Sequence, residues 1–504
     1  MQSRQDALRS DAETGTASEA LGDAASPAPG SRPGQWSALA DRLQGDLVLP
    51  DDDGYELAKQ LQYAEFDAVN PRAIAYCESA SDVQECVRYA RSRGIPIAVR
   101  SGGHAVLGWS TGPGLVIDLT RIKHATVSGD TVHIGPGLEA IDALVGLGAQ
   151  GKQLITGTCP TVCPGGFLSG GGIGLQTRKF GVGSDRLVSA SVVLADGSLV
   201  RASEQEEPDL FWALRGGGGG NFGVVVDFEV RPIEAPRMVF FHTVWPWEKA
   251  AEVLAAWQTW TLKASHDLGA QLMFMLPDAA PGNVPLVFVN GGYLGPKPEL
   301  DAALEQLTAL VGVGPTESFA TDLSYLEAMR NIYGCAELTP EQSHRVGHNP
   351  DATLHRSGFL REQYRYTDRP FDAAELTALV SHFDADRQPG QLRALHCMSL
   401  GGVANQVGPT ATAYVHRSAQ FIVGLASEVV QPAPGLPEAV EAFAAGAAAL
   451  LEPIASGAYV NFPGATVPDW QTAYYGQNYP RLVRVKRRYD PDNLFAHGRS
   501  IGQA

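Results

Sequence analysis

Short apolar segments alternate with amphipathic helical segments in the first half of the chain. Residues 73–77 (AIAYC) and 95–99 (IPIAV) have the continuous apolar character of buried strands. Between them, residues 82–94 (DVQECVRYARSRG) repeat apolar positions at helical spacing, with Ser81 and Asp82 at the expected start and Gly94 at the expected end. The pattern predicts strand, helix, strand.

The pattern changes near residue 232. Before it, further strands are expected at 115–119, 131–135, 189–197 and 223–230, separated by glycine clusters. After it, helical patterns at 247–264 and 298–312 alternate with strand candidates at 272–276, 286–290, 392–400 and 419–425. We therefore expect two α+β regions, residues 36–235 and 236–454, and a closing segment, 455–504, with a basic helix at 479–490. Residues 1–35 lack apolar periodicity and are expected to form a flexible tail.

The composition is that of a globular protein, with one excess. Glycine accounts for 56 of 504 residues, about 11%, against a usual level of about 7%. Hydrophobic residues make up 44%, which excludes disorder of the whole chain. The net charge of −17 opposes binding to a polyanion, so a nucleic-acid partner is not expected.

The chain lacks the signals of a membrane or disulfide-rich protein. No run of about 18 apolar residues occurs, and the first 15 residues lack the apolar core of a secretory signal. Six cysteines are too few for a disulfide scaffold of this length. We therefore expect no membrane partner and a cytoplasmic location.

Two glycine-rich loops are the main candidates for ligand binding. Residues 100–114 (RSGGHAVLGWSTGPG) follow an apolar strand, and residues 159–174 (CPTVCPGGFLSGGGIG) contain six glycines. Such turns can point consecutive backbone N–H groups at an anion such as a pyrophosphate. An ordinary connection between strands is the alternative for the first loop, but turn formation alone does not explain the second.

Other motif matches fail on their context. The GxGxxG match at 218–223 precedes a strand, whereas a dinucleotide fingerprint precedes a helix. The GxSxG match at 108–112 is also followed by a strand pattern instead of the helix of a nucleophile elbow. His344 and His348 share a helical face only if HRVGH is helical, which Gly347 opposes. We therefore expect no metal site.

Taken together, the motifs resemble those of the berberine bridge enzyme-like oxidases, a branch of the vanillyl-alcohol oxidase and p-cresol methylhydroxylase superfamily. The resemblance rests on RSGGH (100–104), GTCPTV (157–162), GGFLSGGGIGLQTRKFGVGSD (165–185), LVSASVVLADG (187–197), DLFWALRGGGGGNFGVV (209–225), TAYVHR (412–417), YVN (459–461) and YDPDNLF (489–495). It implies FAD as cofactor and a two-lobed α+β fold. Residues 36–235 and 455–504 would form the FAD-binding domain, and 236–454 a substrate domain with an antiparallel sheet backed by helices.

The resemblance implies that the flavin is bonded twice, to His104 and to Cys159. Without it, a solvent-exposed loop histidine and an inert buried cysteine are the simpler interpretations of these two residues. The remaining residues expected at the cofactor are Arg100, Ser101, Gly102, Gly103, Thr158, Val162, Gly165, Gly166, Ser169, Gly170, Gly171, Gly174, Leu175, Gly223, Val224, Val225, Tyr459, Asn461 and Asn493.

Three positions depart from the family pattern. Cys163 stands where a glycine is usual, and we favour a packing role over competition for the flavin. Phe167 replaces a frequent histidine and Ile173 a frequent aromatic residue, which keeps the loop apolar. Val162 resembles the small residue found in relatives that react with dioxygen, although a valine there can also be simple packing.

Oxidation of an alcohol by a flavin requires a base for the hydroxyl proton. The family's YxNY segment reads Tyr459, Val460, Asn461, Phe462 here, so the fourth hydroxyl is missing and Tyr459 is the expected base. We expect Tyr459 and Asn461 to share one face of a strand. The alternative bases are Tyr364, Tyr366 and His416, and a further hydroxyl is missing at Phe359.

The sequence thus predicts an FAD-dependent oxidase that oxidises an alcohol on a small organic molecule and reduces dioxygen to hydrogen peroxide. The missing hydroxyls favour an apolar or aromatic substrate, as in secondary-metabolite tailoring such as antibiotic biosynthesis. The alternatives are a carbohydrate oxidase, a flavin dehydrogenase that avoids oxygen, and a flavinylated storage protein. The sequence does not indicate which oligomeric state the protein adopts.

Overall fold

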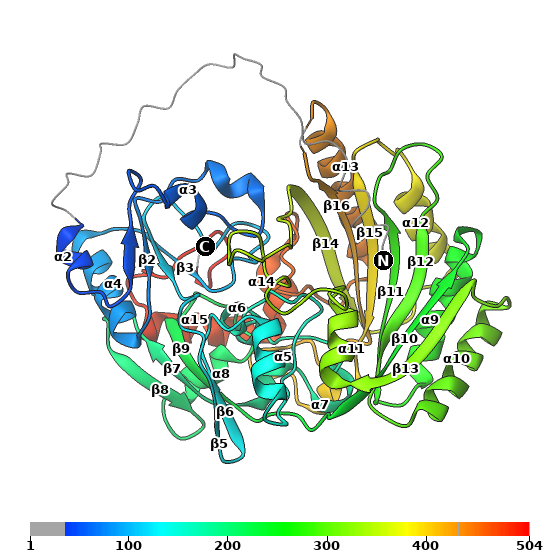
Figure 1. The fold of residues 1–504 in the computed structure, drawn as a ribbon, viewed down its shortest axis with the longest axis horizontal. Coiled ribbons are helices and arrows are strands. Elements are labelled where there is room, and N and C mark those ends of the chain that lie inside the picture. The colour runs from blue at the N-terminus through cyan, green and yellow to red at the C-terminus, as the bar shows by residue number, and fades with distance from the viewer. Residues whose placement is uncertain (1–35, 432, 503–504) are drawn as a thin grey trace.

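The computed structural model describes residues 36–431 and 433–502, and the tail expected at 1–35 lies outside them. The chain forms two lobes that lie side by side, one built on two small sheets and one on a single large sheet (Figure 1). The two-lobed α+β fold expected from the sequence is confirmed.

The first sheet of the first lobe contains the predicted strand, helix, strand unit. Its order is β1 (Asp46–Val48), β2 (Ala73–Tyr76), β4 (Leu115–Asp118) and β3 (Ile97–Arg100), and β2 and β3 both run parallel to β4. Helix α4 (Ala80–Arg93) starts two residues earlier than predicted, because Ser79 instead of Ser81 accepts the N–H of Asp82. Gly94 ends it at a φ of +60°, as expected.

The second sheet of this lobe is antiparallel. Its order is β5 (Ala125–Ser128), β6 (Thr131–Ile134), β9 (Val224–Val230), β7 (Leu187–Val193) and β8 (Leu199–Ser203). The strand expected at 189–197 ends at Val193, and a tight turn leads into β8. The helices of the lobe are α2 (Ser37–Ala40), α3 (Tyr55–Ala58), α5 (Ala140–Gly148), α6 (Pro164–Ser169), α7 (Thr177–Phe180) and α8 (Pro208–Leu214).

The second lobe is a seven-stranded antiparallel sheet. Its order is β13 (Glu317–Ser324), β10 (Arg237–Trp245), β12 (Leu286–Tyr293), β11 (Leu268–Leu276), β15 (Leu392–Ser399), β16 (Phe421–Val429) and β14 (Phe359–Thr367). Four helices, α9 (Ala250–Lys263), α10 (Lys297–Val311), α12 (Ala373–Asp384) and α13 (Leu436–Leu451), cover the outer face, with α11 (Tyr325–Ile332) near the first lobe.

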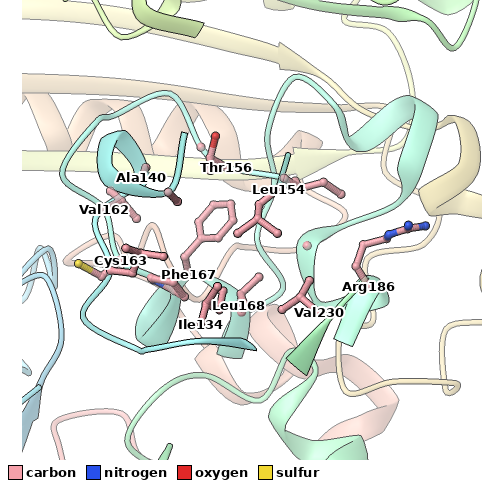
Figure 2. Close-up of a pocket in the computed structure, with 16 residues that line it drawn as sticks. Ile134, Ala140, Leu154, Thr156, Val162, Cys163, Phe167, Leu168, Arg186 and Val230 are labelled. Atoms are coloured by element: carbon pink, nitrogen blue, oxygen red, sulfur yellow. The ribbon is translucent and has the colours of Figure 1, made fainter. Parts of the chain in front are cut away.

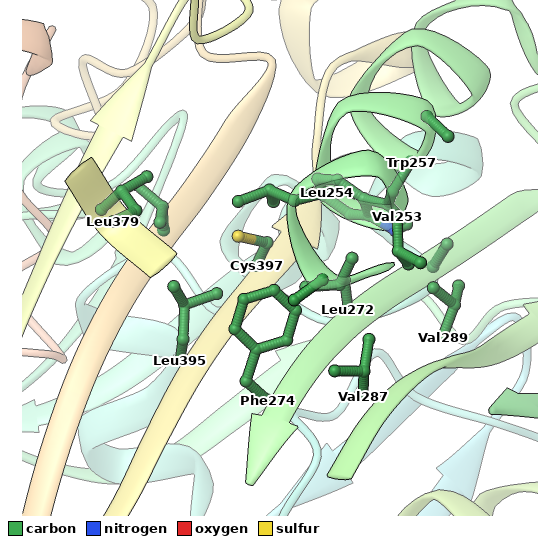
Figure 3. Packing of buried hydrophobic residues seen from close by; sticks show 14 of the residues in the cluster. Val253, Leu254, Trp257, Leu272, Phe274, Val287, Val289, Leu379, Leu395 and Cys397 are labelled. Carbon is green, nitrogen blue, oxygen red and sulfur yellow. The ribbon is translucent and has the colours of Figure 1, made fainter. Parts of the chain in front are cut away.

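The core of this lobe lies between the sheet and the four outer helices. Val253 and Trp257 of α9 are fully buried and pack over the strands that carry Phe274 and Leu395 (Figure 3). These apolar side chains alternate with residues on the opposite face of each strand, which looks toward the first lobe. The packed outer helices therefore leave the inner face of the sheet available to form a site.

The closing segment returns to the first lobe. Helices α14 (Trp470–Tyr475) and α15 (Tyr479–Tyr489) follow one another, and Leu482 and Val485 are buried in the core beneath the second sheet. Phe495 is buried with Leu115 in the core of the first sheet. Within the described ranges, no helix is long and apolar enough to cross a membrane.

Candidate active site

A cavity of about 500 Å³ is lined by loops of the first lobe and by the inner face of the large sheet. Its volume falls within the range of about 300–1,000 Å³ that is usual for ligand sites. Fourteen of the residues expected at the cofactor line it: Ser101, Gly102, Gly103, His104, Thr158, Cys159, Val162, Gly165, Gly166, Ser169, Gly223, Val225, Tyr459 and Asn461.

Seven other expected residues do not line the cavity: Arg100, Gly170, Gly171, Gly174, Leu175, Val224 and Asn493. Arg100 is buried, paired with Asp118, and donates to the carbonyl of Ala58 at 2.7 Å. A side chain at Gly174 would collide with the carbonyl of Thr156. Asn493 takes a φ of +52° in the turn after α15. The structure therefore gives these positions a packing or turn role and no direct place on the cavity wall.

The two expected flavin anchors meet at one hydroxyl group. His104 Nε2 lies 2.8 Å from Thr161 Oγ1, and Cys159 Sγ lies 3.6 Å from the same oxygen. Burial, with the nearby positive charge of Arg345, lowers the pKa of His104 to about 4, so its imidazole is neutral and keeps a lone pair. Both side chains line the cavity and are thus positioned for bonds to one ligand.

Cys163 also lines the cavity, but its thiol makes packing contacts, and the packing role that we favoured stays a prediction. Its thiol is buried and contacts the carbonyl of Gly137 at 3.5 Å, and burial raises its pKa well above the usual range. A Cβ at Gly102 would lie 2.9 Å from its sulfur, so the tight turn after β3 and Cys163 pack against each other.

Residues 164–169, expected as loop, form helix α6, because Pro164 occupies its first position and suits a helix start.

Glycines leave open backbone along the cavity wall. A Cβ at Gly166 or Gly220 would meet no atom within 4 Å among the described residues, and Gly219 would meet none closer than 3.5 Å. All three residues line the cavity. The bare backbone and the neutral His104 fit a nucleotide cofactor that approaches the chain closely, as FAD does.

A second, smaller cavity adjoins the first and measures about 30 Å³. Figure 2 shows Phe167 at its centre, between Leu154, Leu168 and Cys163. Val162 and Phe167 line both cavities. The smaller cavity is mainly apolar, although Thr156 and Arg186 also line it, and it has room for about two water-sized molecules.

The second lobe contributes two apolar side chains and one carboxyl group to the cavity wall. Leu360, Met398 and Glu362 of β14 line it together with Ser357, and Phe462 of the closing segment adds a further apolar side chain. Oε1 of Glu362 is buried and has no hydrogen-bond partner within the described part of the chain, and burial raises the pKa of this carboxyl to about 8. Sequence reasoning missed Glu362, although its position between Leu360 and Tyr364 places it on an apolar strand face.

Tyr459 lines the cavity, but its segment is not the expected strand. Residues 459–462 form a turn, closed by the N–H of Phe462 and the carbonyl of Tyr459. The Tyr459 hydroxyl accepts hydrogen bonds from the N–H groups of Gly172 (2.9 Å) and Ile173 (3.3 Å), and from Asn461 Nδ2 (2.9 Å). Burial nevertheless raises the pKa of Tyr459 to about 12.

The three alternative bases lie behind the cavity wall. Tyr366 is fully buried, and its hydroxyl accepts a hydrogen bond from the Tyr414 hydroxyl at 2.9 Å. Its backbone also pairs with Ser456 and Gly457 of the closing segment. His416 Nε2 donates to the carbonyl of Tyr474 at 3.0 Å. Tyr364 packs its ring on Phe462 at 4.7 Å. None of the three lines the cavity, which argues against the expectation that they act as bases.

The fold and the cavity define an FAD-dependent oxidoreductase, and two family models agree. The FAD binding domain matches residues 71–203, and the model described as berberine and berberine like matches residues 458–502. The chain is 31% identical over 470 residues to (R)-6-hydroxynicotine oxidase of Paenarthrobacter nicotinovorans, covering 91% of this chain and 97% of the relative. The chain belongs to the berberine bridge enzyme-like family of FAD-linked oxidoreductases.

Two further comparisons bear on the site. The aclacinomycin-N/aclacinomycin-A oxidase of Streptomyces galilaeus is 28% identical over 86% of this chain and 85% of its own length. The glucooligosaccharide oxidase of Acremonium strictum has a similar structure, with a TM-score of 0.81, 24% identity and coverage of 93% of this chain and 98% of that one. That structure is described as containing 6-S-cysteinyl, 8α-N1-histidyl FAD.

Proposed function

We propose that this protein is an oxidase that holds FAD through covalent bonds to His104 and Cys159 and oxidises a hydroxyl group of a small organic molecule. The observation that carries the proposal is the shared contact of both side chains with Thr161 on the wall of a cavity that also contains the buried carboxyl of Glu362. The substrate CH–OH group loses two electrons and two protons and becomes a carbonyl. Dioxygen takes them up as hydrogen peroxide.

Bound flavin supplies the acceptor for the hydride that leaves the substrate carbon. Glu362 receives the hydroxyl proton, because a pKa of about 8 lies close to the working pH. Tyr459 has a pKa of about 12 and is a much weaker candidate. Its hydroxyl, held by two backbone N–H groups and Asn461, orients the substrate instead.

The apolar lining supports a largely apolar or aromatic substrate. Leu360, Met398 and Phe462 line the same cavity as Glu362, and Phe462 stands where the family pattern has a tyrosine hydroxyl. The missing hydroxyl at Phe359 does not support an apolar substrate, because Phe359 does not line the cavity. Its ring packs beneath the Arg361 guanidinium, whose central carbon lies 4.0 Å from the ring centroid. The aclacinomycin relative supports a tailoring step in secondary metabolism. A carbohydrate oxidase is the second candidate, supported by the glucooligosaccharide oxidase.

The small cavity beside Val162 supports dioxygen as the electron acceptor. It is mainly apolar, has room for one diatomic molecule, and shares Val162 with the large cavity. An apolar molecule such as dioxygen is favoured there over water, which would find few hydrogen-bond partners. A dehydrogenase that avoids oxygen would give no peroxide during turnover, and a storage protein would show no bleaching of its flavin by any substrate.

Attachment of the flavin is tested by denaturation. Acid-precipitated wild-type protein is expected to remain yellow, and the intact mass should exceed the chain mass by that of FAD. His104→Ala and Cys159→Ala should each keep the flavin through the other bond, whereas the double variant should release it. A double variant that still holds flavin after denaturation would show that another residue is an anchor.

Substrate class is tested by a peroxide-coupled screen of two panels. One contains polycyclic and other aromatic alcohols, and the other contains mono- and oligosaccharides. Higher kcat/KM on the first panel supports the apolar assignment, whereas higher values on the second identify the carbohydrate oxidase. Turnover with an artificial acceptor but without peroxide would identify a dehydrogenase.

A further inference from the structure

The connection between α11 and β14, residues 333–358, leaves the second lobe and runs along the first. We call it the strap. Near its end, the N–H of Ser357 donates to the carbonyl of Gln62 at 3.0 Å, and the N–H of Ala64 donates to the carbonyl of Ser357 at 2.8 Å. Both terminal nitrogens of Arg356 donate hydrogen bonds to the carboxylate of Asp67. The strap is thus fixed to the first lobe at this end.

Two histidines in the middle of the strap lie against the start of α5. The rings of His344 and His348 are stacked, with centroids 4.4 Å apart and planes 12° from parallel. Helical spacing is not needed for this, because the HRVGH segment folds as a turn that brings the rings together. The loop therefore brings the two imidazoles as close together as a helix would.

The imidazole and carboxylate groups converge. His344 Nε2 lies 3.1 Å from Asp142 Oδ1 and 3.5 Å from Glu139 Oε2, and His348 Nδ1 lies 3.6 Å from Glu139 Oε1. One ligand atom from each of Glu139, His344 and His348 can be chosen so that all lie within 4.8 Å of one another. Nitrogen and oxygen donors of this kind suit a borderline divalent ion.

The other ring nitrogen of His344 has the partner expected for a metal ligand. Nδ1 donates to the carbonyl of Glu341 at 3.2 Å, which leaves the lone pair on Nε2. That lone pair faces the oxygens of Asp142 and Glu139, an arrangement that requires a proton or a cation between them. Glu139 is only 9% exposed, yet its Oε2 accepts no hydrogen bond from any described residue.

We propose that Glu139, His344 and His348 bind one divalent ion of the zinc class, with Asp142 as a fourth ligand. Tetrahedral zinc with bonds of about 2.0–2.2 Å places its ligand atoms about 3.3–3.6 Å apart. Each histidine nitrogen lies near that spacing from one of the two Glu139 oxygens, His344 Nε2 at 3.5 Å from Oε2 and His348 Nδ1 at 3.6 Å from Oε1. The His348 side chain is 27% exposed, so the ion enters from solvent on that side.

The ion would join the strap to α5 at a second point. Because Ser357 of the strap lines the large cavity, the ion stabilises the junction of the two lobes beside the flavin site. This role is independent of the reaction, and it holds whatever the substrate. Magnesium and calcium are not expected to bind, because they favour sites made of oxygen ligands alone.

The test uses untagged holoprotein that has been dialysed against a chelator. Titration calorimetry with Zn²⁺ should give about one site per chain, confirmed by elemental analysis after gel filtration. At a free Zn²⁺ concentration 100 times the Kd, the Tm should rise by about 2 °C. His348→Ala, which removes a partly exposed ligand, should weaken Kd at least tenfold. His355→Ala, an exposed histidine of the same strap, is the matched control and should leave Kd unchanged.

Glu139→Gln provides a second variant, read out by the same titration and by flavin absorbance to verify folding. It should also weaken Kd at least tenfold. The proposal is overturned if the wild-type protein binds none of Zn²⁺, Co²⁺ and Ni²⁺, which would mean that a proton occupies His344 Nε2. It is equally overturned if folded His348→Ala and Glu139→Gln bind Zn²⁺ as tightly as the wild type.

Discussion

Replacing Glu362 with glutamine removes the proton acceptor while keeping the size of the side chain. Burial raises the pKa of Glu362 to about 8 and that of Tyr459 to about 12. At pH 7, formation of the carboxylate costs about 1.4 kcal/mol, whereas formation of the phenolate costs about 7 kcal/mol. This difference of about four powers of ten in the population of the base favours Glu362 over Tyr459 as the proposed base.

The expected signature is a change in the pH profile. The wild-type rate of flavin reduction should rise about tenfold per pH unit up to about pH 8 and then level off, because a base works only when it is deprotonated. Glu362→Gln should lower the rate about 10²- to 10⁴-fold and abolish that rise. Tyr459→Phe should lower the rate but keep the rise.

The assay is anaerobic stopped-flow reduction of the flavin between about pH 5.5 and 9.5, with the best substrate from the screen. Anaerobic conditions separate substrate oxidation from the reaction with oxygen. If Glu362→Gln keeps both the rise and more than about a tenth of the wild-type rate, Glu362 is not the base. If instead Tyr459→Phe abolishes the rise, the tyrosine has that role.

Three further substitutions test the packing of the structure. Arg417 is only 5% exposed and binds both carboxylate oxygens of Asp185, so Arg417→Ala should cost about 3–5 kcal/mol of stability and lower the Tm measured by calorimetry. Arg488→Ala, at a pair where the arginine side chain is 59% exposed, should cost less than about 1 kcal/mol, and equal losses would contradict the argument. Cys163→Ala should leave the flavin attached, because this thiol packs against the carbonyl of Gly137. Intact mass measures the attachment. Loss of the flavin would show that Cys163 takes part in it.

Strong periodicity made the main elements of the fold predictable. Helices α4, α9 and α10 repeat apolar positions at helical spacing. Strands β4 and β9 are recognisable instead as short, mainly apolar runs. The edge strand β13 is mostly exposed and has no apolar alternation, so the pattern did not predict it. Helix α6 was missed because its two glycines are poor helix formers.

The site was predictable where sequence motifs mark it, in the glycine-rich loops and in the segment with Tyr459 and Asn461. His104 and Cys159 stand next to such motifs, and both line the cavity. Glu362 belongs to no motif, and a glutamate within a strand usually faces solvent. Here it is half-buried on the cavity wall, which only the folded chain reveals. His344 and His348 came together through a turn whose shape the sequence does not reveal.

The burial of Phe495 beside Leu115 has a consequence for synthesis of the chain on the ribosome. Folding of N-terminal domains normally starts as soon as they emerge. Here the first sheet receives Phe495, and Lys486 donates to the carbonyls of Asn221 (2.7 Å) and Phe495 (2.6 Å), so the lobe is incomplete until these late residues are made. Residues 495–497 also line the large cavity. The nascent first lobe must therefore remain partly open while the whole second lobe is translated, and the cofactor can be enclosed only afterwards.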